Sequence, residues 1–150
     1  VSPWWKEHGD PAWPELRKKM IDILQQDARL QQVVKLVGAD VLPDKQRLVL
    51  ETANLFKNAF LQQSAFDTND MYAGPAKQVK MLKIIVSFYT LALETIEKGA
   101  ALLKIKRMRI LDSIARMKFN ISNDNVAELD DLYKKMKKEF RRMGEIYERF

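Results

Sequence analysis

The sequence predicts an all-α fold, a bundle of about five helices that begins with an antiparallel helical hairpin. Apolar residues recur at spacings of three and four along most of the chain, which is the period of a helix. The chain has only five Gly and five Pro, and most of them fall where these periodic segments begin or end. No segment alternates apolar and polar residues with the period of two that a strand requires. At 150 residues, with 47% of them apolar and 31% charged, the chain has the size and composition of one globular domain.

The first helix is predicted from Pro14 to Val37. Pro14 suits the first position of a helix, and Gly38 suits the residue that follows its last turn. Asp27 interrupts the apolar stripe at a position with core spacing. The stripe itself consists of Leu16, Met20, Ile23, Leu30, Val34 and Val37.

The second helix is predicted from Pro43 to Gln62, again with a proline at its start. The connection from Gly38 to Leu42 is short, so the first two helices should pack side by side in opposite directions. The residues along one side of this second helix are Leu48, Thr52, Leu55, Phe56, Ala59 and Phe60.

A loop is predicted from Ser64 to Gly74, because this stretch has no helical period and ends in Gly-Pro. Pro75 should begin the third helix, which the apolar spacing carries to Gly99. A fourth helix is predicted from there to about Lys118.

The fifth helix has the most regular period, and Asn120 to Asn123 supply capping residues before it. This pattern is typical of a coiled coil or of a packing face within a bundle. In a domain of this size we favour packing within the chain over an exposed dimerisation helix. The residues of this seam are Val126, Leu129, Tyr133, Met136, Phe140, Met143, Tyr147 and Phe150.

Several classes of chemistry are excluded by composition. The chain has no Cys, which excludes disulfides, thiolate metal sites and cysteine nucleophiles. Its single histidine is His8, near the start, so a Ser-His-Asp triad is not expected. Its five glycines lie too far apart for a phosphate-binding loop. The run from Asp67 to Tyr72 starts like a calcium loop, but Tyr72 stands where that loop needs Gly. We therefore predict neither catalytic nor metal-binding residues in this chain.

The segment from Lys98 to Lys118 contributes much of the net charge of +6. Such a stretch can bind nucleic acid or acidic membrane lipid, or it can be the solvated face of a helix. It has no aromatic residues interleaved with its charges and no helix-turn-helix spacing, so nucleic acid is not an expected partner. A basic nucleic-acid-binding or scaffold module remains the alternative interpretation.

The compartment is predicted to be cytoplasmic. The longest apolar run, Ile84 to Leu93, is too short to span a membrane, and no signal peptide is visible. The chain starts at Val1 rather than at Met, which we interpret as a processed or shortened N-terminus.

Two aromatic residues, Phe66 and Tyr72, stand six positions apart in the otherwise polar loop. Aromatic residues beside a helix end commonly fill the core. The alternative is a pocket in which the two rings stack on a flat ligand such as a nucleobase.

Several short motifs lie along the first two thirds of the chain. They are Asp10-Pro11-Ala12-Trp13-Pro14-Glu15-Leu16-Arg17, Leu36-Val37-Gly38, Leu42, Phe60-Leu61-Gln62-Gln63, Ala65-Phe66, Tyr72 and Met81-Leu82. Together these motifs resemble the C-terminal domain of the catalytic A subunit of archaeal- and vacuolar-type rotary ATPases. The resemblance is densest from Asp10 to Ile96, and Ser64 and Ala73 depart from the residues usual in that family.

The resemblance implies a role for two regions. Phe66 and Tyr72 would line the pocket for the adenine of ATP, and the tip of the hairpin, with Asp40, Asp44 and Lys45, would face the central stalk. The phosphate-binding loop and the ligands of Mg²⁺ would lie in an upstream nucleotide-binding domain, so that this chain alone is inactive.

The resemblance also implies an organisation and a set of partners. Residues 1–13 would be the linker from the missing nucleotide-binding domain, and residues 14–150 the helical domain. The partners would be that domain, the B subunits of the catalytic hexamer and the central stalk. The intact protein would use ATP or ADP with Mg²⁺ and work on the cytoplasmic face of the cell membrane, coupled to proton or sodium transport.

Overall fold

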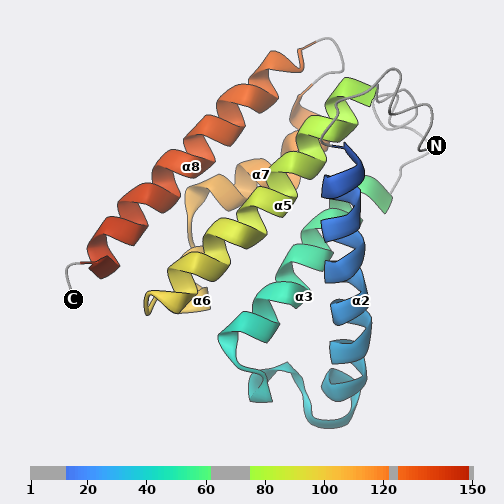
Figure 1. Ribbon diagram of the computed structural model, residues 1–150, viewed down its shortest axis with the longest axis vertical. Coiled ribbons are helices and arrows are strands. Elements are labelled where there is room, and N and C mark those ends of the chain that lie inside the picture. Colours follow the sequence, from blue (N-terminus) through green and yellow to red (C-terminus); the bar gives the residue numbers. More distant parts are fainter. Residues whose placement is uncertain (1–12, 62–74, 122–124, 149–150) are drawn as a thin grey trace.

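The computed structural model describes residues 13–61, 75–121 and 125–148, and every regular element in these ranges is helical (Figure 1). The all-α prediction is therefore confirmed. In chain order the elements are α2 (Trp13–Val37), the 3₁₀ turn η1 (Ala39–Val41), α3 (Asp44–Phe56), the π-helical turn η2 (Lys57–Leu61), α5 (Pro75–Glu97), α6 (Leu102–Lys106), α7 (Arg109–Asn120) and α8 (Ala127–Glu148).

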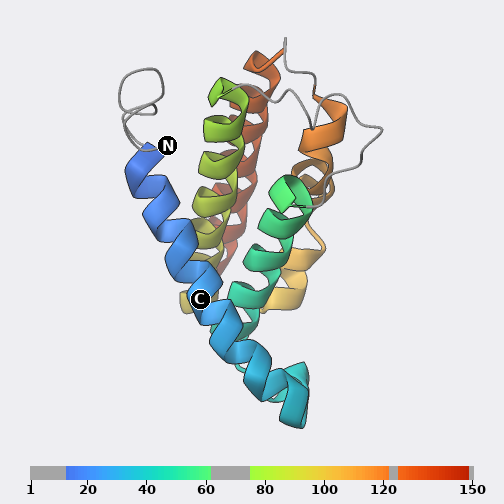
Figure 2. The same ribbon diagram turned by 90° about the vertical axis from the view of Figure 1, so that its right-hand side faces the viewer.

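The central element is α5, which packs against α2 and α3 on one side and against α7 and α8 on the other (Figures 1 and 2). A helix that is apolar around most of its circumference is stable only when it is covered on several sides. No described helix is both long enough and apolar enough to span a bilayer. The buried apolar side chains of α5 are Val79, Met81, Leu82, Ile84, Ile85, Val86, Phe88 and Ala92.

The predicted hairpin is present, since α2 and α3 pack against each other in opposite directions and η1 joins them. Gly38 has φ 87°, a conformation that side chains other than glycine rarely adopt. Its N–H donates to the carbonyl of Val34 at 2.9 Å, which closes the last turn of α2. The glycine predicted to follow the first helix therefore marks its end, in a backbone conformation that is open essentially to glycine alone.

Two predicted helices differ from the structure. The second is not one α-helix from Pro43 to Gln62, because it changes to the π-helical turn η2 at Lys57, and Gln62 lies outside the described residues.

The fourth predicted helix is two helices, α6 and α7, separated at Arg107 and Met108. The buried residues on either side of this break, Ile105 and Ile110, are five positions apart. The two helices have different neighbours, since α6 packs against α3 whereas α7 packs against α8 and η2.

The seam of α8 packs within the chain, against α5 and α7, as we favoured from the sequence. Its residues Leu129, Met136 and Phe140 are buried, and the ring of Phe140 lies 5.9 Å from that of Phe88 in a tilted arrangement. Phe150, the last residue of the predicted seam, lies outside the described residues.

One buried charge joins the start of α5 to the end of α7. Lys77 is 1% exposed, and its Nζ donates to the carbonyl of Ile121 at 2.6 Å. A lysine is rarely buried unless its ammonium group is hydrogen-bonded. This contact therefore fixes where α7 ends relative to α5.

The packing of α8 predicts a large effect of Phe140→Ala. Removing a buried ring leaves a cavity, and we expect the free energy of unfolding to fall by about 3–5 kcal/mol. Denaturant unfolding followed by circular dichroism measures this loss. Arg142→Ala, an exposed change on the same helix, should alter it by about 0.5 kcal/mol or less. Equal losses in the two variants would contradict the described position of α8.

Candidate functional site

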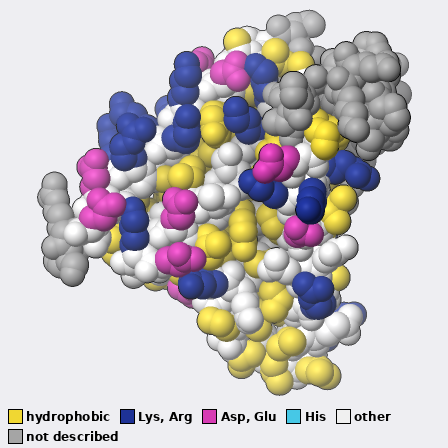
Figure 3. Space-filling view, in the orientation of Figure 1, with side chains coloured by type: hydrophobic (Ala, Val, Ile, Leu, Met, Phe, Trp, Pro, Cys, Tyr) yellow, Lys and Arg dark blue, Asp and Glu magenta, His cyan; other side chains and the backbone are white. Residues whose placement is uncertain are grey.

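The tip of the hairpin carries exposed apolar side chains. We call Val33, Leu36, Val37 and Val41 the tip patch; they are the large apolar residues at this end of the molecule that the structure leaves accessible. Leu36 is 85% exposed and Val41 61% exposed. Apolar side chains gather at the lower end of the molecule in Figure 3, where α2 meets η1. Clustered exposed apolar residues mark an interaction surface more often than single ones do.

The tip patch was not predicted as a site from the sequence. Val37 was assigned to the packing stripe of its helix, and this was wrong, because it is 59% exposed. The last turn of α2 extends past the start of α3, so no neighbouring helix covers it (Figure 2). A usable signal was present, since Leu36 is a large apolar residue that lies outside the predicted stripe of its helix.

The three charges predicted at the tip have different environments. Asp40 is exposed in η1. Asp44 is half-buried, and its Oδ2 accepts a hydrogen bond of 3.0 Å from the N–H of Leu102, at the start of α6. Lys45 places its Nζ 3.8 Å from Oε1 of Glu97, and both side chains are more than half exposed. Asp44 therefore anchors α3 to α6, whereas Lys45 makes a weak surface ion pair.

Glu97 also affects the pKa of the Tyr89 hydroxyl. Burial raises the pKa of Tyr89 above its usual value, and the negative charge of Glu97 raises it further. Both effects favour the neutral phenol, so Tyr89 is uncharged at neutral pH.

Phe66 and Tyr72, the predicted adenine-binding pair, lie outside the described residues. The last described turn before them contains Phe60, whose ring stacks on that of Phe56 at 4.9 Å. Beside this stack is an apolar hollow of about 200 Å³, which Trp13, Met20 and Leu82 also line. Pockets that enclose a whole ligand are larger than this. This hollow alone is therefore too small to enclose a nucleotide.

Metal-ligating side chains do not gather in the described part of the chain. No three His, Asp or Glu side chains converge there in an arrangement that could hold a metal ion. Mg²⁺ prefers several oxygen ligands at once.

The basic stretch of the predicted fourth helix makes contacts within the chain. Lys98 Nζ lies 2.7 Å from Oε1 of Glu148, and Lys106 Nζ lies 3.1 Å from Oε1 of Glu51. Lys104 Nζ lies 5.7 Å from the centre of the Tyr147 ring. These contacts tie α6 and its neighbours to α3 and α8, which gives part of the basic stretch a structural role.

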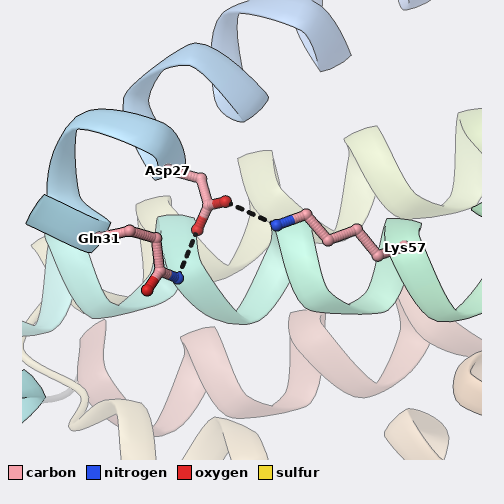
Figure 4. A network of polar contacts seen from close by, with 3 residues as sticks. All are labelled: Asp27, Gln31 and Lys57. Carbon is pink, nitrogen blue, oxygen red and sulfur yellow. Dashed lines mark hydrogen bonds and ion pairs between the residues drawn. The ribbon is translucent and has the colours of Figure 1, made fainter. Parts of the chain in front are cut away.

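Asp27, which looked misplaced in the sequence, joins the two helices of the hairpin (Figure 4). Its Oδ2 lies 2.9 Å from Nζ of Lys57 in η2, and its Oδ1 accepts a hydrogen bond of 3.2 Å from Nε2 of Gln31. Lys57 is 30 residues away, so the sequence alone carried no sign of this partner.

Comparison with known proteins gives the chain a close set of relatives. A family model described as "C-terminal domain of V and A type ATP synthase" matches residues 2–106. The chain is 42% identical over 142 residues to the A subunit of the A-type ATP synthase of Staphylothermus marinus, covering 95% of this chain and 23% of the relative. It is 40% identical over 148 residues to the alpha chain of the V-type ATP synthase of Halothermothrix orenii, covering 99% of this chain and 25% of that relative. The chain therefore spans about a quarter of the length of these curated relatives.

The two neighbouring charges at the start of α3 should differ in their effect on stability. Asp44→Ala removes the acceptor for the N–H of Leu102, and we expect a loss of about 0.5–2 kcal/mol in the free energy of unfolding. Lys45→Ala removes an exposed ion pair and should cost about 0.2–1 kcal/mol or less. Denaturant unfolding of both variants measures the difference. A larger loss for Lys45→Ala would be inconsistent with the anchoring role of Asp44.

Proposed function

Since the chain belongs to the family of C-terminal domains of V and A type ATP synthases, we propose that it is this domain of a longer, catalytic A-type polypeptide. Residues 14–150 form the helical domain, and residues 1–13 link it to an upstream nucleotide-binding domain. The intact polypeptide hydrolyses or synthesises ATP and couples this reaction to proton or sodium transport. The family match and the share of each relative that the chain spans support this assignment.

In this proposal the phosphoryl chemistry belongs to the upstream domain. Holding ATP with Mg²⁺ requires groups that converge on the phosphates, and the described helices bring no three metal-ligating side chains together. The chain alone is inactive. Its partners are the upstream domain, the B subunits of the catalytic hexamer and the central stalk, in a complex that is peripheral on the cytoplasmic face of the membrane.

The hairpin tip contacts the central stalk in this proposal, through Asp40, Asp44 and Lys45 together with the tip patch. The observation that supports it is the exposure of the tip patch, because four apolar side chains left open to water would be covered in a complex. The hydrogen bond from the N–H of Leu102 gives Asp44 a second role in this proposal, which is to hold the start of α3 in place behind the contact.

Phe66 and Tyr72 line the adenine pocket of the intact polypeptide in this proposal. Aromatic ring faces suit a purine, and the residues between Leu61 and Pro75 follow directly on the aromatic stack of Phe56 and Phe60.

The stalk contact predicts that Leu36→Ser uncouples the complex. A leucine that becomes buried contributes about 1.5–3 kcal/mol, so its loss should weaken stalk binding about ten- to hundredfold. The number of ions moved per ATP hydrolysed should therefore fall, whereas the Kd for nucleotide should stay nearly unchanged. Both quantities are measured in the assembled complex.

Two further variants sharpen this test. Asp40→Lys should also lower the ions moved per ATP, because it reverses an exposed charge at the tip. Ile146→Ser, which changes a 55% exposed apolar residue on α8, is the matched control and should leave coupling intact. Normal coupling in Leu36→Ser, or equal uncoupling by Ile146→Ser, would rule out the tip patch as the stalk contact.

The adenine assignment predicts that Phe66→Ala weakens ATP binding in the intact polypeptide by about 1–3 kcal/mol, which is the range for losing one stacking ring. This corresponds to a rise in Kd of about ten- to hundredfold. Tyr72→Phe keeps the ring face and should change Kd little. Fluorescence titration with a nucleotide analogue measures these values.

The core-filling alternative predicts a different pattern. There Phe66→Ala would cost about 3–5 kcal/mol of folding stability through a cavity. A variant that melts much earlier than the parent protein, yet binds ATP normally while folded, would end the adenine hypothesis.

A further inference from the structure

The turn that follows α3 has an unusual geometry. η2 continues α3 without a break but is π-helical from Lys57 to Leu61. At the junction the N–H of Lys57 is shared between the carbonyls of Ala53 and Asn54. A π turn contains an extra residue and changes the direction of the side chains after it, and such turns occur mostly at functional positions. Contacts outside the helix have to hold this geometry, because hydrogen bonding within one helix favours the α form.

Asp27 supplies such a contact at the first residue of the turn. Its side chain is only 5% exposed, whereas that of Lys57 is 43% exposed. The carboxylate is therefore the buried member, and the lysine reaches it from the surface. Both carboxylate oxygens are occupied, one by Lys57 and the other by Gln31 (Figure 4). On its other side η2 packs against α7.

We propose that Asp27 is a positioning residue: its ion pair with Lys57 holds η2 in the π-helical form and joins it rigidly to α2. Asp27 lies ten residues before the end of α2, about 15 Å along the helix axis. A displacement of the tip patch thus reaches η2 through the last turns of α2 and the ion pair of Asp27 with Lys57. This transmission rests on the proposed function, whereas the positioning of η2 does not.

The positioning is tested by amide hydrogen exchange on the full chain. Asp27→Asn and Lys57→Met should each speed the exchange of residues 57–61 by about tenfold or more, relative to α5 and α8, because each breaks the ion pair. Lys57→Met should have the larger effect, since it leaves the carboxylate buried without its partner. Lys57→Arg keeps the charge and should change exchange by less than about threefold.

Two controls separate positioning from general stability. Met136→Ala, at a fully buried position in α8, lowers stability without touching the ion pair and should not accelerate residues 57–61 selectively. The double variant Asp27→Leu with Lys57→Met replaces the buried pair by apolar side chains, which commonly preserves folding. It should fold stably and still exchange about tenfold faster at 57–61.

Restored protection of residues 57–61 in the double variant would overturn the inference, because Asp27 would then only contribute stability. An even acceleration across all helices in Asp27→Asn, as in Met136→Ala, would overturn it as well.

The transmission is tested with the same double variant in the assembled complex, where we expect fewer ions moved per ATP hydrolysed. If Leu36→Ser uncouples the complex but the double variant does not, transmission through Asp27 is wrong and the proposed function stands. If neither uncouples, the stalk contact itself fails, and transmission fails with it.

Discussion

The burial of α5 from both sides is the constraint on which the other elements depend. Its apolar side chains point in nearly every direction, so one neighbouring layer cannot cover them. The hairpin of α2 and α3 covers one side, and α7 with α8 covers the other. Each of these helices is amphipathic and needs an apolar partner for a single face only. The arrangement thus follows from the difference between α5, which has to be buried on both sides, and the four helices α2, α3, α7 and α8, which cover it.

This arrangement divides the hairpin into an anchored part and an accessible part. The start of α3 is held to α6 by the hydrogen bond from Leu102 to Asp44, and to the end of α5 by the weaker pair of Lys45 and Glu97. The last turn of α2 has no such neighbour and presents the tip patch. A surface of this kind can contact a partner while the start of α3 stays anchored. The half-buried ion pair of Asp27 and Lys57 joins α2, which carries this surface, to the first residue of η2.

Sequence reasoning succeeded where a helix is governed by its own residues. Gly38 and Pro75 marked helix boundaries, and the regular seam of α8 marked its packing face. It failed where helices meet. The change from α3 to η2 at Lys57 depends on contacts with α2 and α7, and the break at Arg107 separates α6, which packs against α3, from α7, which packs against α8. Neither the π-helical turn nor the break can be recognised from the neighbouring residues in the sequence, because both depend on contacts with helices from other parts of the chain.

The sequence by itself determined the helical class, the hairpin at the start and the family to which the chain belongs, because periodicity, capping residues and motifs are local. It also marked Phe66 and Tyr72 as aromatic residues in a polar stretch. Only the tertiary structure decided that Asp27 is buried against Lys57, that Asp44 caps α6, and that Leu36 and Val37 are left uncovered. The physical reason is that burial and ion pairing depend on which helix lies opposite a side chain. In this bundle that neighbour is set by how α5 is covered.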